Sequence, residues 1–258
     1  MHAGGPVLGV ARPPPVLRLD GCALFLDLDG TLLELAPRPD AVSVEPGLLE
    51  LLRALVRRSG GALAVVSGRS IATLDTLLDP VRLPLSGMHG FERRDATGVR
   101  VSRPPPNLEA LQEARYLMAR WVAREPRLVI EDKGLALALH YRQAPQLEAE
   151  VVSSVTAIAS RPGSGLRAQR GRLVVELTPD TASKATAIAE FMHEQPFAGR
   201  RPVYVGDDLT DEPAFEWVNA AGGISVAVDI AAPTGARTHL GSVTEVRAWL
   251  RALLDAAE

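Results

Sequence analysis

The amino-acid sequence predicts an α/β fold: a Rossmann-like parallel sheet forms the core, and a smaller α+β unit is inserted into it. Three observations lead to this prediction. Short runs that are apolar on both faces alternate with amphipathic helical segments, as in parallel sheets covered by helices. Polar residues and glycines follow these runs directly, at the sheet edge where such folds bind ligands. Between residues 104 and 179 the order changes to helix, hairpin, helix, hairpin, which favours an antiparallel sheet backed by two helices.

The first half of the core follows an N-terminal segment, residues 1–18, which we expect to be disordered because it contains a glycine pair and three consecutive prolines. The expected elements are a strand over 23–28, a helix over 46–58, a strand over 62–66, a helix over 71–78 and a short strand over 84–87. The leucines of the first helix recur every three or four residues, so one side of that helix is expected to be buried.

The middle of the chain begins after three further prolines, at 104–106. Its expected elements are a helix over 108–124, strands over 127–132 and 135–141, a helix over 146–160 and two strands around Arg170 and Gly171. The core then resumes with a helix from about Lys184 to His193, strands over 202–205 and 224–228, and a helix over 243–257. We therefore expect a core of residues 19–103 and 180–258 and an α+β cap of residues 104–179.

The composition excludes several classes of protein. Of the 258 residues 47% are hydrophobic, enough for a large core without disulfides, and the single cysteine, Cys22, is expected to be a small core side chain. With 28 Lys and Arg against 31 Asp and Glu, the net charge of −3 does not favour non-specific binding to nucleic acid or to anionic membranes. No membrane span or signal peptide is recognisable, so we expect a cytoplasmic protein with a small-molecule partner.

Two acidic residues, Asp27 and Asp29, end the first apolar strand. Residues two apart on a strand share a face, so both carboxyl groups are expected to leave the sheet edge in one direction. Two carboxylates that close together require a cation or a shared proton, and either suits catalysis. The alternative is a strand that ends in an ordinary polar turn, which Asp and Gly favour for local reasons.

Three further polar motifs are expected at the ends of the same strands. They are Ser67-Gly68-Arg69, Lys184 at a helix start, and Gly206-Asp207-Asp208 with Asp211 shortly after. Each is weak alone, since Lys184 could be a surface lysine and Asp207 could cap the next helix. Taken in order with Asp27-Leu28-Asp29-Gly30-Thr31, they resemble the four motifs of the haloacid dehalogenase superfamily of phosphohydrolases.

This resemblance implies a different role for each of the acidic residues. Asp27 would be the nucleophile that forms an aspartyl-phosphate, and Asp29 would protonate the leaving oxygen and then deprotonate the attacking water. A magnesium ion would be held by Asp27, the backbone carbonyl of Asp29 and Asp207. Asp208 and Asp211 would orient these ligands.

The resemblance also implies how the phosphate is held. Ser67 and Lys184 would bind its non-bridging oxygens, because phosphoryl transfer requires their charge to be offset. Gly68 and Arg69 would add contacts to the substrate. For Arg69, a salt bridge on the surface or to the cap is an equal alternative.

Longer strings resemble the trehalose-6-phosphate phosphatase family within that superfamily. They are Leu85 to Glu92, Glu131-Asp132-Lys133, His140-Tyr141-Arg142, Glu176 in a strand before Pro179, and Gly206 to Glu212. The similarity extends from about Leu24 to the C-terminal helix. Two departures, Ala185 after the motif lysine and Leu28 between the two aspartates, remove no chemical group. His140 and Arg142 are expected to brace the cap sheet.

In the resembled family, Glu131, Lys133 and Glu176 would contact the sugar unit that carries no phosphate. Buried carboxylates and an ammonium suit this task, because a disaccharide offers many hydroxyls. The alternative is an exposed turn and a cross-strand ion pair. His89 could bind the substrate or only fix its own loop.

The resemblance therefore implies a magnesium-dependent phosphatase that acts on trehalose 6-phosphate beneath a closing cap. Two alternatives remain open: a phosphatase for another sugar phosphate, such as a sucrose, mannosyl-glycerate or glucosyl-glycerate phosphate, and a catalytically silent sugar-phosphate sensor. A silent sensor would be expected to lack Asp27 or Asp29, and this chain has both. We expect a monomer, with a functional link to a trehalose-6-phosphate synthase as a further expectation.

Overall fold

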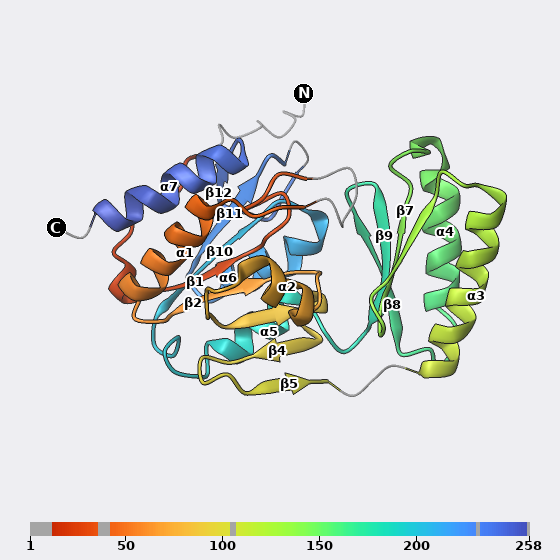
Figure 1. Ribbon diagram of the computed structural model, residues 1–258, viewed down its shortest axis with the longest axis horizontal. Helices are drawn as coiled ribbons and strands as arrows, with labels where there is room; N and C mark the ends of the chain where they lie inside the picture. The colour runs from red at the N-terminus through yellow and green to blue at the C-terminus, as the bar shows by residue number, and fades with distance from the viewer. Residues whose placement is uncertain (1–11, 36–41, 104–106, 231–232, 257–258) are drawn as a thin grey trace, which may run out of the picture.

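The structure, a computed structural model, describes residues 12–35, 42–103, 107–230 and 233–256 (Figure 1). Its larger sheet has the strand order β12-β11-β10-β1-β2-β3-β4-β5. The strands are β1 (Cys22–Leu26), β2 (Leu63–Val66), β3 (Leu85–Gly87), β4 (Glu92–Arg94), β5 (Arg100–Ser102), β10 (Arg201–Gly206), β11 (Ile224–Val228) and β12 (Thr238–Leu240). Those from β12 to β3 run parallel, and β4 and β5 extend the sheet antiparallel. The predicted parallel core is confirmed.

Helices cover both faces of this sheet. They are α1 (Pro46–Arg58), α2 (Ile71–Leu78) and α7 (Val243–Asp255) on one face, and α5 (Lys184–Phe191) and α6 (Glu212–Ala220) on the other. Successive residues of β1 alternate between the two cores: Leu24 packs in the aliphatic cluster with α1, and Phe25 packs against Phe191 of α5. Burial on both faces explains why β1 is an uninterrupted apolar run.

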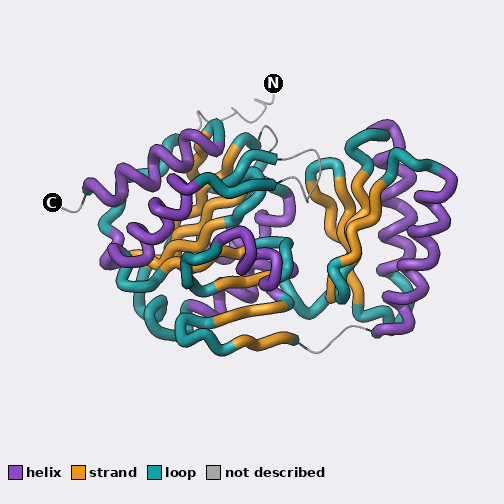
Figure 2. The backbone as a smooth tube through the Cα atoms, in the orientation of Figure 1, coloured by secondary structure: helices purple, strands orange, loops and turns teal. Residues whose placement is uncertain are grey.

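The inserted cap has its own antiparallel sheet, in the order β6-β7-β9-β8. Its elements are α3 (Leu108–Arg124), β6 (Val129–Asp132), β7 (Leu137–His140), α4 (Glu148–Ala159), β8 (Leu166–Gly171) and β9 (Val174–Pro179). Both helices cover the sheet face that is turned away from the core (Figure 2). The predicted α+β insertion is confirmed, whereas the domain boundaries remain a prediction. The sheet face without helices is turned toward the larger sheet (Figure 1).

Strands β4, β5 and β12 were not expected from the sequence. β4 reads Glu92-Arg93-Arg94, a string without apolar residues, yet both arginines are buried. Ion pairs explain this burial: Arg93 Nη1 lies 2.6 Å from Glu194 Oε2, and Arg94 Nη1 lies 2.6 Å from Asp75 Oδ1. A strand stabilised by paired charges carries no hydrophobic pattern for sequence analysis to detect.

Part of the N-terminal segment expected to be disordered, residues 1–11, lies outside the described residues. Residues 12–18 contact the core: the backbone N–H of His239 donates to the Arg12 carbonyl at 2.9 Å, and Trp249 Nε1 donates to the Pro15 carbonyl at 3.0 Å. Cys22 is buried in the aliphatic cluster, as expected. Among the helices that the structure describes, none has the length and apolar character needed to cross a membrane.

Gly90, in the turn after β3, packs against the start of α5. Its φ is +99°, and a Cβ atom there would lie 2.2 Å from the backbone oxygen of Ser183. Ser183 caps α5 by accepting a hydrogen bond from the backbone N–H of Thr186, and Lys184 is the first residue of this helix. Because the close contact is with backbone, no change of rotamer can make room for a side chain.

We expect Gly90→Ala to lower the free energy of unfolding by about 2–4 kcal/mol, since it combines a strained positive φ with overpacking. Gly98→Ala is the matched control: its φ is +91°, but a Cβ atom would meet nothing within 4 Å. The control should therefore lose only about 1 kcal/mol. Urea denaturation of both variants measures the difference, and equal losses would show that the contact with Ser183 is not close in solution.

Candidate active site

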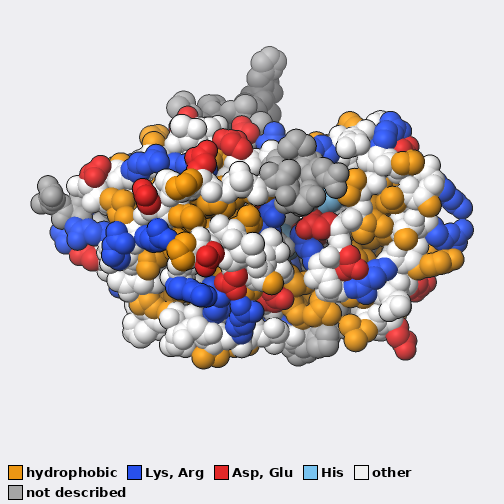
Figure 3. Space-filling view, in the orientation of Figure 1, with side chains coloured by type: hydrophobic (Ala, Val, Ile, Leu, Met, Phe, Trp, Pro, Cys, Tyr) orange, Lys and Arg blue, Asp and Glu red, His pale blue; other side chains and the backbone are white. Residues whose placement is uncertain are grey.

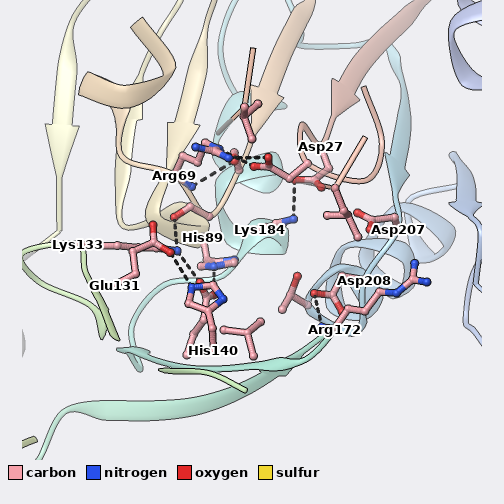
Figure 4. A pocket seen from close by; sticks show the side chains of 18 of the residues that line it. Asp27, Arg69, His89, Glu131, Lys133, His140, Arg172, Lys184, Asp207 and Asp208 are labelled. Carbon is pink, nitrogen blue, oxygen red and sulfur yellow. Dashed lines mark hydrogen bonds and ion pairs between the residues drawn. The ribbon is translucent and has the colours of Figure 1, made fainter. Parts of the chain in front are cut away.

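The carboxyl ends of the parallel strands border a pocket between the larger sheet and the cap sheet (Figure 4). Charged side chains and histidines gather in the seam between the two lobes (Figure 3). The pocket is lined by every residue predicted for catalysis, substrate or metal: Asp27, Asp29, Ser67, Gly68, Arg69, His89, Glu131, Lys133, Glu176, Lys184 and Asp207. The structure thus brings the predicted residues together, while their individual roles stay predictions.

Gly30 allows the turn after β1 to approach the end of β10. Its φ is +81°, and a Cβ atom there would lie 1.9 Å from Asp207 Oδ2. Beside it, Thr31 Oγ1 donates a hydrogen bond to Asp207 Oδ1 at 3.4 Å. The Asp-Gly-Thr string therefore places the carboxylate of Asp207 against the turn that carries Asp27 and Asp29.

Lys184 is the buried centre of the site. Its Nζ lies 2.8 Å from Asp27 Oδ1 and 2.5 Å from Asp211 Oδ1. Tyr204 Oη donates to the same Asp211 oxygen at 2.6 Å, and the backbone N–H of Asp208 donates to Asp211 Oδ2 at 3.0 Å. Burial alone would lower the pKa of Lys184, but the charges of Asp211 and Asp27 raise it well above its usual value. The alternative of a solvated surface lysine is wrong, because only 3% of the residue is exposed.

Three carboxylates, those of Asp27, Asp207 and Asp211, place oxygens within 4.8 Å of one another. Burial raises the pKa of Asp27 to about 7 against the opposing charge of Lys184. Burial, with the charges of Asp27 and Asp211, raises the pKa of Asp207 to about 10. A divalent cation would offset this repulsion, and carboxylate oxygens are ligands that hard cations prefer. Because both Asp211 oxygens already accept hydrogen bonds, Asp27 and Asp207 are the carboxylates available to an ion.

The carboxylate of Asp29 is paired with Arg69 rather than with the clustered acids. Arg69 Nε lies 2.6 Å from Asp29 Oδ2, and Arg69 Nη2 lies 2.8 Å from Asp29 Oδ1. Burial alone would lower the pKa of Arg69, but the hydrogen bond and charge of Asp29 and the charge of Glu131 raise it. The salt bridge of Arg69 is therefore made inside the pocket with a core residue, so it is neither the surface nor the cap salt bridge considered as an alternative.

The cap adds a second set of charges to the pocket. Lys133 Nζ lies 2.5 Å from Glu176 Oε1 and donates to the Gly68 carbonyl at 3.1 Å. Glu176 also forms an ion pair with His89. Burial alone would raise the pKa of Glu176, but the charges of His89 and Lys133 lower it well below its usual value. The ion pair considered as an alternative is present, and it lies in the pocket with Glu176 only 7% exposed.

His140 and Arg142, expected to brace the cap sheet, also line the pocket. His140 Nε2 lies 3.0 Å from Glu131 Oε2. Burial would raise the pKa of Glu131, but the hydrogen bond of His140 and the charge of Lys133 lower it. Glu131 is thus held as a charged acceptor at the cap wall of the pocket.

The turn between β8 and β9 reaches the core, which the sequence did not predict. The backbone N–H of Arg172 donates to Asp208 Oδ2 at 3.2 Å, and Arg172 Nη1 lies 3.2 Å from Asp229 Oδ2. Gly171 permits this approach, since a Cβ atom there would lie 2.7 Å from Asp208 Oδ2. An Arg-Gly-Arg turn gives no sequence signal that separates a docked turn from a solvated one. For Tyr204, also missed, the available signal was a hydroxyl in an otherwise apolar strand.

The parallel core, the paired aspartates after β1 and the inserted cap define a phosphohydrolase of the haloacid dehalogenase type. The chain belongs to the trehalose-phosphatase family, whose model matches residues 25–243. It is 44% identical to the trehalose-6-phosphate phosphatase of Escherichia coli K12 over 236 residues, 92% of this chain and 88% of that protein. A probable trehalose-phosphate phosphatase of Sinorhizobium fredii is 43% identical over 240 residues, with the same coverage of 92% and 88%.

A solved structure gives the same fold. The C-terminal domain of Candida albicans trehalose-6-phosphate phosphatase matches with a TM-score of 0.84, covering 96% of this chain and 99% of that chain. The two are 20% identical, so this likeness concerns the fold alone.

We expect Tyr204→Phe to lower the rate of phosphate release by about tenfold, because Asp211 loses one of the hydrogen bonds that fix it against Lys184. The same change should lower the free energy of unfolding by about 1 kcal/mol. Tyr141→Phe is the matched control. Its hydroxyl donates to Glu148 at 3.3 Å in the cap, and its ring is equally buried. Steady-state rates and thermal unfolding of both variants provide the comparison; similar rates in the two would remove Tyr204 from the site.

Proposed function

We propose that this protein hydrolyses trehalose 6-phosphate to trehalose and inorganic phosphate through an aspartyl-phosphate on Asp27. The observation that carries the proposal is the pairing of Asp27 with the buried ammonium of Lys184, at the base of a pocket whose other wall is the charged cap. Membership of the trehalose-phosphatase family supports the choice of reaction and of sugar.

In the first step, an Asp27 carboxylate oxygen attacks phosphorus and the bond from phosphorus to the sugar oxygen breaks. The electron pair of that bond stays on the sugar oxygen, which takes a proton from Asp29. In the second step, water gives a proton to Asp29 and its oxygen attacks phosphorus, which releases the Asp27 carboxylate. Ser67 and Lys184 hold the non-bridging oxygens, whose negative charge must be offset throughout.

The cofactor in this proposal is Mg²⁺, held by the carboxylates of Asp27 and Asp207 and the backbone carbonyl of Asp29. When bound, the ion offsets the charge of the carboxylate and phosphate that must approach one another. Asp208 and Asp211 act through hydrogen bonds that orient the neighbouring groups.

The cap residues supply the sugar contacts in this proposal. Glu131 and Glu176 accept hydrogen bonds from sugar hydroxyls, and Lys133 donates to them. These side chains now satisfy one another, as in the pairs of Lys133 with Glu176 and of Glu131 with His140. Substrate would therefore exchange charged partners for hydroxyls, which favours a ligand with many hydroxyls in fixed positions.

We place this activity in the cytoplasm and propose that the chain acts as a monomer. A trehalose-6-phosphate synthase would then be its functional partner, by supplying the substrate. Size-exclusion chromatography with light scattering tests the monomer directly, and a dimer mass would contradict it.

One assay tests substrate and cofactor together. It measures phosphate release from trehalose 6-phosphate, sucrose 6-phosphate and glucose 6-phosphate, with Mg²⁺ or with EDTA. We expect the highest kcat/KM with trehalose 6-phosphate and a loss of activity in EDTA that added Mg²⁺ restores. Asp27→Asn should reduce the rate by at least about 10³-fold, because an amide cannot form the covalent intermediate. An unchanged rate in this variant would contradict the nucleophile, and a preference for sucrose 6-phosphate would contradict the substrate.

Replacing Glu176 by Gln is expected to raise KM for trehalose 6-phosphate by roughly 10–100-fold, since a hydrogen bond to a charged group contributes about 1.5–3 kcal/mol. The rate with p-nitrophenyl phosphate, which has no sugar, should change little. Glu148→Gln is the matched control: it removes a cap carboxylate that pairs with Arg170 at 2.6 Å outside the pocket. Equal effects of Glu176→Gln on both substrates would contradict a sugar contact.

A further inference from the structure

We propose that Arg69 is a positioning residue for proton transfer: its guanidinium orients the carboxyl group of Asp29, and the carbonyl of the preceding residue, Gly68, accepts a hydrogen bond from Lys133 of the cap. The proposal rests on the proposed function, since it concerns the group that gives a proton to the departing sugar. It gives Arg69 a role other than phosphate binding, which is the role that a basic side chain in this motif would otherwise be assigned.

The contact between Arg69 and Asp29 is a fork. Two different guanidinium nitrogens reach two different carboxylate oxygens, at 2.6 and 2.8 Å (Figure 4). Such bidentate pairs fix both the position and the plane of the carboxylate, which a single ammonium contact cannot do. A group that delivers a proton to one defined atom needs this kind of constraint.

The pair also holds Asp29 apart from its crowded neighbours. Asp27 and Asp207 belong to the cluster of buried carboxylates, and Asp29 follows Asp27 by two residues on the same turn. With Asp211 this cluster already holds three carboxylates, and a fourth without a counter-charge would add to the repulsion there. Arg69 offsets the charge of Asp29 locally. The carboxyl group of Asp29 can then act on the sugar oxygen of the phosphate ester rather than join the clustered acids.

The turn that carries Arg69 is bonded to the core on one side and to the cap on the other. The Arg69 carbonyl accepts from the Met88 N–H at 2.9 Å, and the Arg69 N–H donates to Ser67 Oγ at 3.2 Å, both within the core. The preceding carbonyl, of Gly68, accepts the 3.1 Å hydrogen bond of Lys133 Nζ. Lys133 of the cap is therefore bonded to the turn that orients Arg69. Closure of the cap would fix the sugar and the acid in one movement.

The chemistry of the leaving group gives a readout that a purely structural role would not move. A sugar alkoxide is a poor leaving group, so trehalose departs as the neutral alcohol, with a proton placed on its oxygen as the phosphorus–oxygen bond breaks. A p-nitrophenolate keeps the electron pair of that bond without a proton. Since kcat/KM covers the steps up to departure of the first product, it isolates the acid role of Asp29 from its later role as a base.

The experiment compares kcat/KM of Arg69→Gln and Arg69→Lys on trehalose 6-phosphate and p-nitrophenyl phosphate. For Arg69→Gln we expect a loss of at least about tenfold on the sugar phosphate, mostly in kcat, and less than about threefold on the aryl phosphate. Arg69→Lys keeps the charge without the fork and should fall between wild type and Arg69→Gln. In an Asp29→Asn background, Arg69→Gln should cause little further loss, because both changes remove one function.

The control is Arg94→Gln, which breaks an ion pair of matching burial outside the pocket. The side chains of Arg94 and Asp75 are 9% and 27% exposed, against 12% and 28% for Arg69 and Asp29. This variant should show similar destabilisation in thermal unfolding and near wild-type kcat/KM on both substrates.

Three outcomes would overturn the proposal: equal losses on both substrates in Arg69→Gln, losses that multiply with those of Asp29→Asn, or unchanged rates. The first would make Arg69 a phosphate ligand, and the second a residue that acts independently of Asp29. A wild-type protein that releases phosphate from the aryl phosphate but not from trehalose 6-phosphate would instead overturn the proposed function.

Discussion

The buried ammonium of Lys184 is the interaction on which the rest of the site depends. Asp27, Asp207 and Asp211 meet at one sheet edge, where burial and mutual repulsion oppose their ionisation. Lys184 reaches Asp27 and Asp211 at once, so one cation fixes two of the three acids. Removing one partner of such a buried set costs far more than the set contributes, because the remaining charges cannot be rehydrated. The acidic residues around Lys184 therefore keep their positions only while this one ammonium group is in place.

The parallel core was predictable because burial on both faces leaves an unbroken apolar string, as in β1. The positions of Asp27 and Ser67 followed from the rule that parallel strands end at one edge, and Lys184, which begins α5, was placed beside them by the resemblance of the four motifs. β4 was not predictable, because Arg93 and Arg94 are buried by ion pairs with residues distant in sequence. The turn at Arg172 was missed because its partners are defined by tertiary contact and no local pattern encodes them, whereas the hydroxyl of Tyr204 in an apolar strand was a signal that does not identify its partner.

The cap illustrates how charged recognition groups can be stable without a ligand. Glu176 is buried between His89 and Lys133, and Glu131 is bonded to His140, so both carboxylates have partners within the protein before a ligand binds. Preformed pairs of this kind hold side chains in place before binding. They also set a threshold for binding, because a ligand must supply hydrogen bonds that compensate for the pairs it displaces.

The cap hairpin at Gly171 and Arg172 has a consequence for mutational tolerance. The contact with Asp208 uses the backbone N–H of Arg172, which nearly every amino acid can provide, and the exposed pair with Asp229 contributes little. At Gly171 the decisive feature is the absence of a side chain. A side chain at position 171 would first have to displace the side chains of Asp208 or Val174, so substitution is more constrained there than at position 172, where only a backbone N–H is used.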